Sequence, residues 1–358
     1  MPPSPAISQA DLAFQDASLQ GVSRTFALTI PQLPEALQAV VGNAYLLCRI
    51  ADTIEDDPGL STAQKTRFSE SLIETVAGRQ SPETFANSLL PLLTGVTTPA
   101  EQELIRNTDR VVGITHRFST AQREELERCV RIMSRGMAEF QRRTDPHGVP
   151  DLPAFERYCY YVAGVVGEML TGLFCHYSEE IRRNRSALME LAVSFGAVLQ
   201  MTNILKDVWE DRRRGACWLP RDIFHAEGFE LRGLSESNHG AEFRQGMRKL
   251  IALAHGHLQN GLDYILLIPA RESGIRRFCL WSLAMSALTL RKLNAHLDFT
   301  SGGQVKISRR AVRFATITTR LLAKRDRLLR HWFGLVTSPL PEALPLSRSA
   351  LLRCREGA

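Results

Sequence analysis

Apolar residues recur at helical spacing along nearly the whole chain. No segment shows the sustained alternation of apolar and polar residues that marks a half-buried strand. The sequence therefore predicts an all-α protein with long helical segments of roughly 20 to 35 residues, well above the usual mean of about 11–12. The expected breaks are rich in Pro, Gly or short polar residues and lie at 31–34, 57–61, 95–99, 144–153, 215–237, 269–274 and 301–303.

The same pattern suggests how the chain is divided. We expect a flexible N-terminal segment at 1–17, a single domain at 18–335 and a loosely ordered tail at 336–358, where Pro and Ser become frequent. The longest uncharged apolar stretches, 191–205 and 279–290, are shorter than the ~20 residues that cross a bilayer. We therefore interpret both stretches as core helices.

A polar stripe interrupts one of the apolar helices. Tyr45, Arg49, Asp52 and Asp56 fall within about 60° of one another on a helical wheel, and Glu55 lies beside them. The flanking Leu and Ile residues point elsewhere. A tyrosine, an arginine and two carboxylates therefore share one helix face.

A second stripe follows the same design. Gln200, Asn203, Asp207 and Asp211 span about 80° of a helix that is otherwise largely apolar. Polar groups on such a helix need partners. Two acidic stripes of this kind are harder to explain by folding than one.

The paired carboxylates point to a divalent cation. Carboxylates at i and i+4 lie ~5–6 Å apart and repel each other by roughly 2–3 kcal/mol at an effective dielectric constant of about 20. A cation removes this penalty, and Mg²⁺ prefers hard oxygen ligands, with water and phosphate oxygens filling the remaining positions. If the two helices face each other, they would hold Mg²⁺ between them and bind a diphosphate through it.

Composition excludes several classes of protein. The 358 residues carry 44 Lys+Arg against 38 Asp+Glu, and 44% of them are hydrophobic, which is ordinary for a globular chain and excludes disordered and fibrous proteins. The seven cysteines are scattered without a C-x-x-C pair, so we expect neither a disulfide framework nor a zinc site. The first ten residues lack the pattern of a secretion signal, and we expect a cytoplasmic protein.

Positive charge is concentrated near the C-terminus. Residues 301–358 hold 12 Lys+Arg and three Asp+Glu, a net charge of +9. Such a segment indicates contact with an anionic group, whether lipid headgroups, a diphosphate or a phosphorylated cofactor. The alternative is a solvated basic helix face.

Four segments in order resemble the squalene and phytoene synthases, which are head-to-head prenyltransferases. They are Ser-Arg-Thr-Phe at 23–26, the Asp52 motif, residues 158–167 and the run from Asn203 to Pro220. The resemblance covers residues 18–335. It implies an isoprenoid synthase fold, with long helices around a central apolar cavity, in which two prenyl diphosphates are joined through a cyclopropyl intermediate.

The resemblance also implies roles for individual residues. The residues that it implies as metal ligands are Asp52, Glu55, Asp56, Asp207 and Asp211. The residues that it implies as substrate-binding are Arg24, Thr25, Phe26, Tyr45, Arg49, Gln200, Asn203 and Phe278. Tyr161 matches a tyrosine that assists ionisation or proton transfer in the first half-reaction. Tyr161 and the four aspartates form the expected catalytic set.

The C-terminal part favours a squalene synthase. The segment around Lys306 and Arg309 is similar to the Lys/Arg cluster that binds the phosphates of NADPH in those enzymes, although Ser308 interrupts it and Ser282 and Leu283 also depart from their pattern. We therefore expect an enzyme closest to bacterial-type squalene synthases, an Mg²⁺-dependent farnesyl-diphosphate farnesyltransferase that uses NADPH. Its substrate is farnesyl diphosphate. We expect no nucleic-acid partner, and either free solution or peripheral attachment at the inner membrane face.

Alternative functions remain at this stage. Relatives of the same family make dehydrosqualene or phytoene, or only presqualene diphosphate or hydroxysqualene. A non-catalytic assembly factor on the same fold is a second class, although such homologues tend to lose aspartates that are all present here. A helical metal-dependent phosphohydrolase is remote, because none of the nine histidines is followed by Asp.

Overall fold

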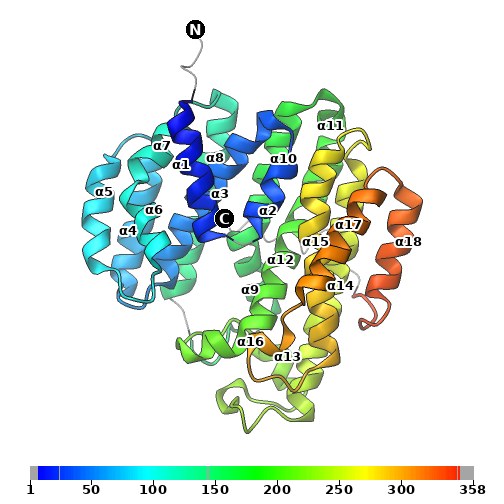
Figure 1. Ribbon diagram of the computed structural model, residues 1–358. Helices are drawn as coiled ribbons and strands as arrows, with labels where there is room; N and C mark the ends of the chain where they lie inside the picture. The colour runs from blue at the N-terminus through cyan, green and yellow to red at the C-terminus, as the bar shows by residue number, and fades with distance from the viewer. Residues whose placement is uncertain (1–6, 24, 143–144, 345, 347–358) are drawn as a thin grey trace. The chain divides into compact units, whose positions relative to one another are not determined.

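Every regular element of the described chain is helical (Figure 1). The computed structural model describes residues 7–23, 25–142, 145–344 and 346. Within these residues there is no β-strand, and extended pairing is limited to two isolated bridges. The all-α prediction is therefore confirmed.

The chain divides into two compact units. The first unit comprises Met1–Arg143 and Glu168–Arg183, and the second comprises Thr144–Gly167 and Asn184–Ala358. Each unit has its own set of packed helices and is described on its own below.

The first unit is built around helix α3. Its elements are α1 (Gln9–Val22), α2 (Phe26–Thr29), η1 (Ile30–Gln32), α3 (Glu35–Asp56), α4 (Thr62–Val76), α5 (Pro82–Leu89), η2 (Leu90–Leu92), α6 (Pro99–Arg106), α7 (Thr108–Thr115), α8 (Thr120–Arg142), most of α10 (Val165–Tyr177) and α11 (Glu179–Arg183). Helix α3 packs against α1, α4, α6, α7 and α8. Its Leu46, Leu47 and Ile50 are fully buried, so this long helix is the core of the unit.

Buried polar groups fix the position of α3. The Asn43 side chain donates to the Val111 carbonyl of α7 at 2.9 Å and accepts from the Thr115 hydroxyl at 2.7 Å. At the other end, the Asp57 carboxylate accepts from the backbone N–H groups of Gly59 and Thr94. These bonds satisfy groups that burial would otherwise penalise, and they hold both halves of α3 in register with α7 and the loop before α6.

The N-terminal part differs from the expectation. Helix α1 begins at Gln9, within the segment expected to be flexible, and Ser8 caps it by accepting the Asp11 N–H at 3.1 Å. Buried Leu19 and Gln15 attach the helix to the rest of the unit. The Ser-x-x-Asp pattern at residues 8–11 is an N-capping signal, and it marks the start of α1.

The second unit contains the longest helices. Its elements are α9 (Leu152–Cys159), the π-helical turn η3 (Tyr160–Gly164), the start of α10, α12 (Arg185–Arg213), α13 (Arg221–His225), η4 (Leu231–Gly233), α14 (Ala241–Leu267), α15 (Ser273–Ala295), α16 (Gly302–Val305), α17 (Arg309–Leu322) and α18 (Asp326–Thr337). Helix α12 packs against η3, α14 and α15. Gly215, with a φ of 79°, ends the long helix in the left-handed conformation that favours glycine.

Glycines allow a close crossing between α12 and the η3–α10 segment. A Cβ on Gly196 would lie 2.0 Å from the Ala163 carbonyl oxygen, and a Cβ on Gly167 would lie 2.1 Å from that of Ala192. The backbones therefore touch where no side chain fits. The π-helical turn at Tyr160–Gly164 lies at this crossing, where glycine lets the two backbones pack closely.

A buried arginine ties the C-terminal helices together. The Arg276 guanidinium, with 2% of its side chain exposed, donates to the carbonyls of Leu266, Ile268 and Ala323. It also pairs with Asp326 at 2.5 Å. The end of α14 and the turn between α17 and α18 are thereby held on α15.

Part of the expected loose tail is attached to α14. Leu344 donates its backbone N–H to the Ala252 carbonyl at 3.2 Å, and Leu340 is buried. The His255 Nδ1 atom lies 2.8 Å from the Pro341 carbonyl oxygen. Residue 345 and residues 347–358 of the expected tail lie outside the described residues.

Two helical stretches are long and apolar enough to cross a membrane by length and composition alone. They are Leu152–Tyr177 and Arg185–Arg213, and 83% and 67% of their most apolar windows are buried inside the protein. Core helices pass the same test. We therefore interpret both as core helices, in line with the prediction for residues 191–205.

The buried His257 predicts loss of stability in acid. Among the described residues neither ring nitrogen has a hydrogen-bond partner, and burial lowers the pKa of His257 to about 4. The unfolded chain takes up a proton below about pH 6.5 whereas the folded chain does not, so the free energy of unfolding should fall by about 3 kcal/mol between pH 6.5 and pH 4. Urea unfolding of His257→Leu should lack this loss, and His331→Gln, at an exposed histidine, should keep it. An unchanged pH slope in His257→Leu would show that other groups cause the acid sensitivity.

Candidate active site

The polar stripe of α3 is the accessible strip of an otherwise buried helix. Between Val40 and Glu55 all residues are buried except Tyr45, Arg49 and Asp52, and Asp56 at the end of the helix is exposed. The predicted shared face is confirmed. The helix therefore presents a tyrosine, an arginine and two carboxylates on the one side that its packing leaves open.

One further predicted substrate residue, Phe26, lies beside this stripe. The ring centroids of Phe26 and Tyr45 are 5.0 Å apart, and the Tyr45 hydroxyl donates to the Val22 carbonyl at 3.3 Å. Burial raises the pKa of Tyr45, so its hydroxyl stays protonated at neutral pH. Thr25 precedes α2, and its side chain makes no capping bond there. Arg24 lies outside the described residues.

Arg49 is held by a glutamate that the sequence had not suggested. Its guanidinium pairs with Glu101 of α6 and lies 3.8 Å from the Asp52 carboxylate. Glu101 is 8% exposed and also forms the capping box of α6 with Thr98. The Thr-Pro-Ala-Glu run at residues 98–101 was the signal for that capping box, but its distance in sequence gave no indication of the contact with Arg49.

Burial and neighbouring negative charges raise the pKa values of two carboxylates of α3. Burial is the largest cause that raises the pKa of Asp52 to about 7, against the lowering effect of Arg49, and the negative charges of Asp56 and Glu101 add to it. Burial also raises the pKa of Glu55 to about 8, with Asp56 and Asp52 adding to it. These shifts arise because several negative charges share a site with little water, and a divalent cation would reverse them.

Glu55 is packed more tightly than the other acidic residues of the stripe. It is 8% exposed, and its carboxylate accepts from Gln141 of α8 at 3.4 Å. Lys65 donates to the Glu55 carbonyl oxygen and to Gln141. The sequence did not predict the contacts of Lys65 and Gln141 with Glu55, because these two residues lie on α4 and α8 and Glu55 lies on α3. The expected role of Glu55 as a metal ligand stays a prediction.

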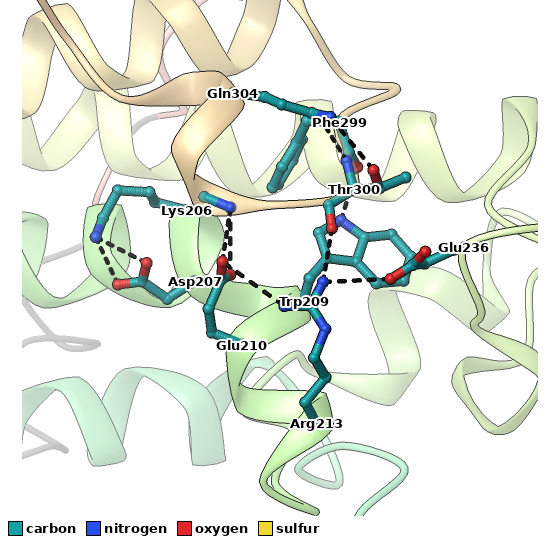
Figure 2. A network of polar contacts seen from close by, with 10 residues as sticks. Lys206, Asp207, Trp209, Glu210, Arg213, Glu236, Phe299, Thr300 and Gln304 are labelled. Carbon is teal, nitrogen blue, oxygen red and sulfur yellow. Dashed lines mark hydrogen bonds and ion pairs between the residues drawn. The ribbon is translucent and has the colours of Figure 1, made fainter. Parts of the chain in front are cut away.

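The second stripe is also accessible on its helix. On α12, Asn203 is exposed and Gln200, Asp207 and Asp211 are partly exposed, whereas residues 192–198 are buried. The shared face predicted for these four residues is therefore confirmed. Figure 2 shows that the Lys206 ammonium pairs with the Asp207 carboxylate, at 2.6 Å.

A set of hydrogen bonds fastens the 299–304 segment onto the acidic end of α12, and we call it the α16 clasp (Figure 2). The Trp209 indole donates to the Phe299 carbonyl at 2.7 Å, and Arg213 donates to the Thr300 carbonyl at 3.1 Å. Glu210 accepts the Gly302 backbone N–H at 3.0 Å. Glu210 therefore positions the 299–304 segment. The residues predicted to bind metal next to it on α12 are Asp207 and Asp211.

The clasp brings the segment very close to Asp207. A Cβ on Gly302 would lie 3.0 Å from the Asp207 Oδ1 atom and 3.1 Å from the Lys206 carbonyl. Only a residue without a side chain fits here without displacing them. Lys306 follows directly after α16, and its carbonyl accepts from Lys292. Arg309 is exposed at the start of α17. The clasp therefore links the two predicted NADPH residues to the second aspartate motif by a short stretch of chain.

The remaining predicted residues of the second unit are buried. Tyr161 is 2% exposed within the π-helical turn, with its ring centroid 5.7 Å from that of Tyr160. Phe278 on α15 is 1% exposed. A π-turn is frequent at functional sites because it aims a side chain differently from a regular helix. The structure does not test the chemical role expected of either residue.

The carboxylates of the two stripes suit Mg²⁺, which also takes ligands from water and phosphate, better than a metal that is bound by protein ligands alone. Among the described residues, no three His, Cys, Asp or Glu side chains form a ready-made metal site. Mg²⁺ is commonly bound by one or two carboxylates together with water and substrate phosphate oxygens. The accessible pairs Asp52/Asp56 and Asp207/Asp211 each offer that number of carboxylates.

Comparison with known proteins gives the family. The model of the squalene/phytoene synthase family matches residues 19–311, most of the chain. The chain belongs to the squalene/phytoene synthase family. A squalene synthase of Botryococcus braunii is 30% identical over 292 residues, which are 78% of this chain and 57% of that protein. A squalene synthase of Cyberlindnera jadinii is 26% identical over 318 residues, 85% of this chain and 68% of that protein.

The structures agree with this assignment. The structure of TcSQS in complex with a ligand superposes with a TM-score of 0.76 at 25% identity, covering 97% of this family member and 96% of that chain. The all-helical fold is thus that of a squalene synthase, the isoprenoid synthase fold. Both curated relatives are eukaryotic, and they give no specific support to the expected likeness to bacterial-type enzymes. This family member spans little more than half of the Botryococcus relative, so its own activity is a matter for proposal.

Proposed function

We propose that this family member is an Mg²⁺-dependent squalene synthase that condenses two farnesyl diphosphates through presqualene diphosphate and reduces the product with NADPH. The observation that carries the proposal is the pair of acidic stripes. Each is the accessible strip of a long core helix in a chain that matches the squalene/phytoene synthase model. The relatives named squalene synthase support the choice of product.

Each pair of aspartates would bind Mg²⁺ within its own unit. Asp52 and Asp56 on α3, and Asp207 and Asp211 on α12, would hold Mg²⁺, which when bound supplies positive charge for the departing diphosphate. Arg49, fixed by Glu101, would orient a diphosphate oxygen with a charge-assisted hydrogen bond. The Tyr45 hydroxyl, protonated because burial raises its pKa, would turn from the Val22 carbonyl to donate a second one.

Apolar and aromatic residues would protect the cation that ionisation leaves behind. An allylic carbocation reacts at once with water, so its surroundings must be dry. The faces of Phe26 and Phe278 could stabilise such a cation by ~0.5–2 kcal/mol. Tyr161, buried in its π-turn, would hold the proton that the first half-reaction transfers.

The α16 clasp supports the reductive half of the proposal. It fastens the segment that leads to Lys306 and Arg309 onto the turn of α12 that carries Asp207. The exposed cations of that segment match the phosphates of NADPH in charge. A nicotinamide held there would be next to a diphosphate-binding motif within the same unit.

The reductive step can be tested with and without NADPH. Purified protein incubated with farnesyl diphosphate and Mg²⁺ should yield squalene when NADPH is present. Without NADPH it should yield presqualene diphosphate or an unreduced product, read by mass spectrometry. If NADPH changes neither the product nor its yield, the enzyme is a dehydrosqualene, phytoene or half-reaction synthase instead.

Removing the charges of the predicted NADPH residues should affect this step selectively. We expect Lys306→Gln combined with Arg309→Gln to raise the KM for NADPH at least about tenfold, because a charge-assisted phosphate contact contributes about 1.5–3 kcal/mol. Presqualene diphosphate should then accumulate. Lys324→Gln, which removes one exposed charge just after α17, is the matched control and should leave the KM unchanged. Equal KM values in all three proteins would place the NADPH site elsewhere.

A further inference from the structure

Helix α17 exposes large apolar side chains that folding does not require. Phe314, Ile317 and Leu321 are 66%, 56% and 70% exposed. They lie within about 60° of one another on the helix. The opposite face, with the buried Ala315 and Thr319, packs against α15. The apolar stripe is therefore an outward-facing surface in addition to the face that holds the helix in the fold.

The neighbouring helix continues this surface. Leu328 and Leu335 on α18 are 48% and 59% exposed, and they are seven residues apart, so they lie on one side of that helix. In Figure 1, α17 and α18 (orange to red) lie next to each other beside α15. We call Phe314, Ile317, Leu321, Leu328 and Leu335 the outer apolar face.

Positive charge surrounds the outer apolar face. Residues 309–330 contain eight Lys+Arg and a single acidic residue, Asp326. All eight cations are exposed. Within the described part of the chain, only Arg330 among them forms an ion pair, with Asp263. Arg313 and Arg320 flank the stripe at about 100–120° from Phe314, where they can reach past it.

Charge complementarity decides what this face can bind. A second copy of the chain would bring two strongly basic surfaces together. Residues 347–358 of the same chain carry three arginines and one glutamate, so they would also be repelled. An anionic bilayer instead offers an apolar layer beneath negative headgroups. We propose that α17 docks the chain onto an anionic lipid surface, with Phe314, Ile317 and Leu321 in the acyl boundary and the arginines at the phosphates.

This docking does not depend on the proposed enzymatic activity. It requires only the exposed stripe and its flanking cations. The face resembles an interfacial amphipathic helix, whose affinity combines buried apolar area with attraction to anionic lipid. A failure of the binding experiment would leave the proposed function intact, and a failure of turnover would leave the docking face intact.

Vesicle flotation with the full chain tests the proposal. The protein should float with phosphatidylcholine vesicles that contain about 30% phosphatidylglycerol and remain in solution with phosphatidylcholine alone, and its binding should fall as salt screens the charges. Phe314→Ser, Ile317→Ser and Leu321→Ser together should weaken binding at least tenfold. Val96→Ser, which removes an exposed apolar side chain of the first unit, should bind like the unmodified protein.

Two further variants test the contributions of the arginines and of the residues after Leu346. Arg313→Gln with Arg320→Gln should lower the affinity for anionic vesicles and flatten its salt dependence. A chain ended after Leu346 should still float, because the outer apolar face remains. Equal flotation of the triple serine variant, or loss of flotation in the shortened chain, would overturn the proposal. A dimer in solution that the triple variant dissociates, without vesicle binding, would identify a second copy as the occupant and would overturn it too.

Discussion

Replacing Asp52 or Asp207 by Asn is expected to lower kcat for farnesyl diphosphate by about 1,000-fold or more, equivalent to about 4 kcal/mol of transition-state stabilisation. The amide keeps the shape of the carboxylate but loses the negative charge that binds Mg²⁺. On α3 it would also leave Arg49 without its second carboxylate neighbour. Steady-state turnover with saturating Mg²⁺ and farnesyl diphosphate measures the effect.

At Asp52 the substitution should not destabilise the fold. Burial raises the pKa of Asp52 to about 7, so the ionised carboxylate is disfavoured there, and a neutral amide should keep or raise the melting temperature. Asp109→Asn, at an exposed aspartate in the first turn of α7, is the matched control and should keep full turnover. Turnover retained in Asp52→Asn and in Asp207→Asn would contradict the metal assignment, and a loss of helical signal would instead indicate a structural role.

Among substitutions that add one methyl group to the second unit, Gly196→Ala is expected to lower the free energy of unfolding most. Its Cβ would lie 2.0 Å from the Ala163 carbonyl oxygen and 3.0 Å from the Gly164 Cα, and both atoms belong to the backbone. Relief of the clash requires α12 and the η3 segment to separate, which loosens the packing around Tyr161. We expect a loss of at least about 3 kcal/mol in the free energy of unfolding, measured with urea.

A matched substitution distinguishes this clash from the general effect of adding a methyl group. Gly334 lies in α18 of the same unit, and no atom lies within 4 Å of the position of its Cβ. Gly334→Ala should therefore be neutral or stabilising by up to about 1 kcal/mol. Equal stabilities of the two variants would show that the helix crossing is looser than described.

The long helices and both acidic stripes could be predicted from the sequence because they depend on one helical period. Asp52 and Asp207 lie on accessible strips, whereas Ile50, Ile54, Leu205 and Val208 beside them are apolar and buried. The breaks at 57–61, 95–99 and 269–274 were also predicted correctly, because Pro, Gly and short polar residues end helices by local chemistry.

The division of residues 62–119 into short helices was missed. The pattern predicted long segments there, whereas the structure has α4, α5, α6 and α7. Ser81 marks the missed start of α5, because its side chain accepts the Thr84 N–H at 3.2 Å and Pro82 follows at the first helical position. This signal was present in the sequence, and an apolar period alone does not show it.

The partners of the site could not be predicted from spacing. Glu101 reaches Arg49 from 52 residues away, and Gln141 reaches Glu55 from 86 residues away. The Glu210–Gly302 contact of the α16 clasp likewise joins residues 92 positions apart. Such contacts depend on how helices pack, which the period of a single helix does not contain.

Product analysis tests the central claim most directly. Purified protein is incubated with farnesyl diphosphate, with Mg²⁺ and then with the metal chelated, and the organic extract and the diphosphates are identified by mass. The account predicts products in which two farnesyl chains are joined, formed only with Mg²⁺ and absent in Asp52→Asn and Asp207→Asn. Farnesol as the sole product, or no consumption of farnesyl diphosphate with Mg²⁺ present, would contradict it.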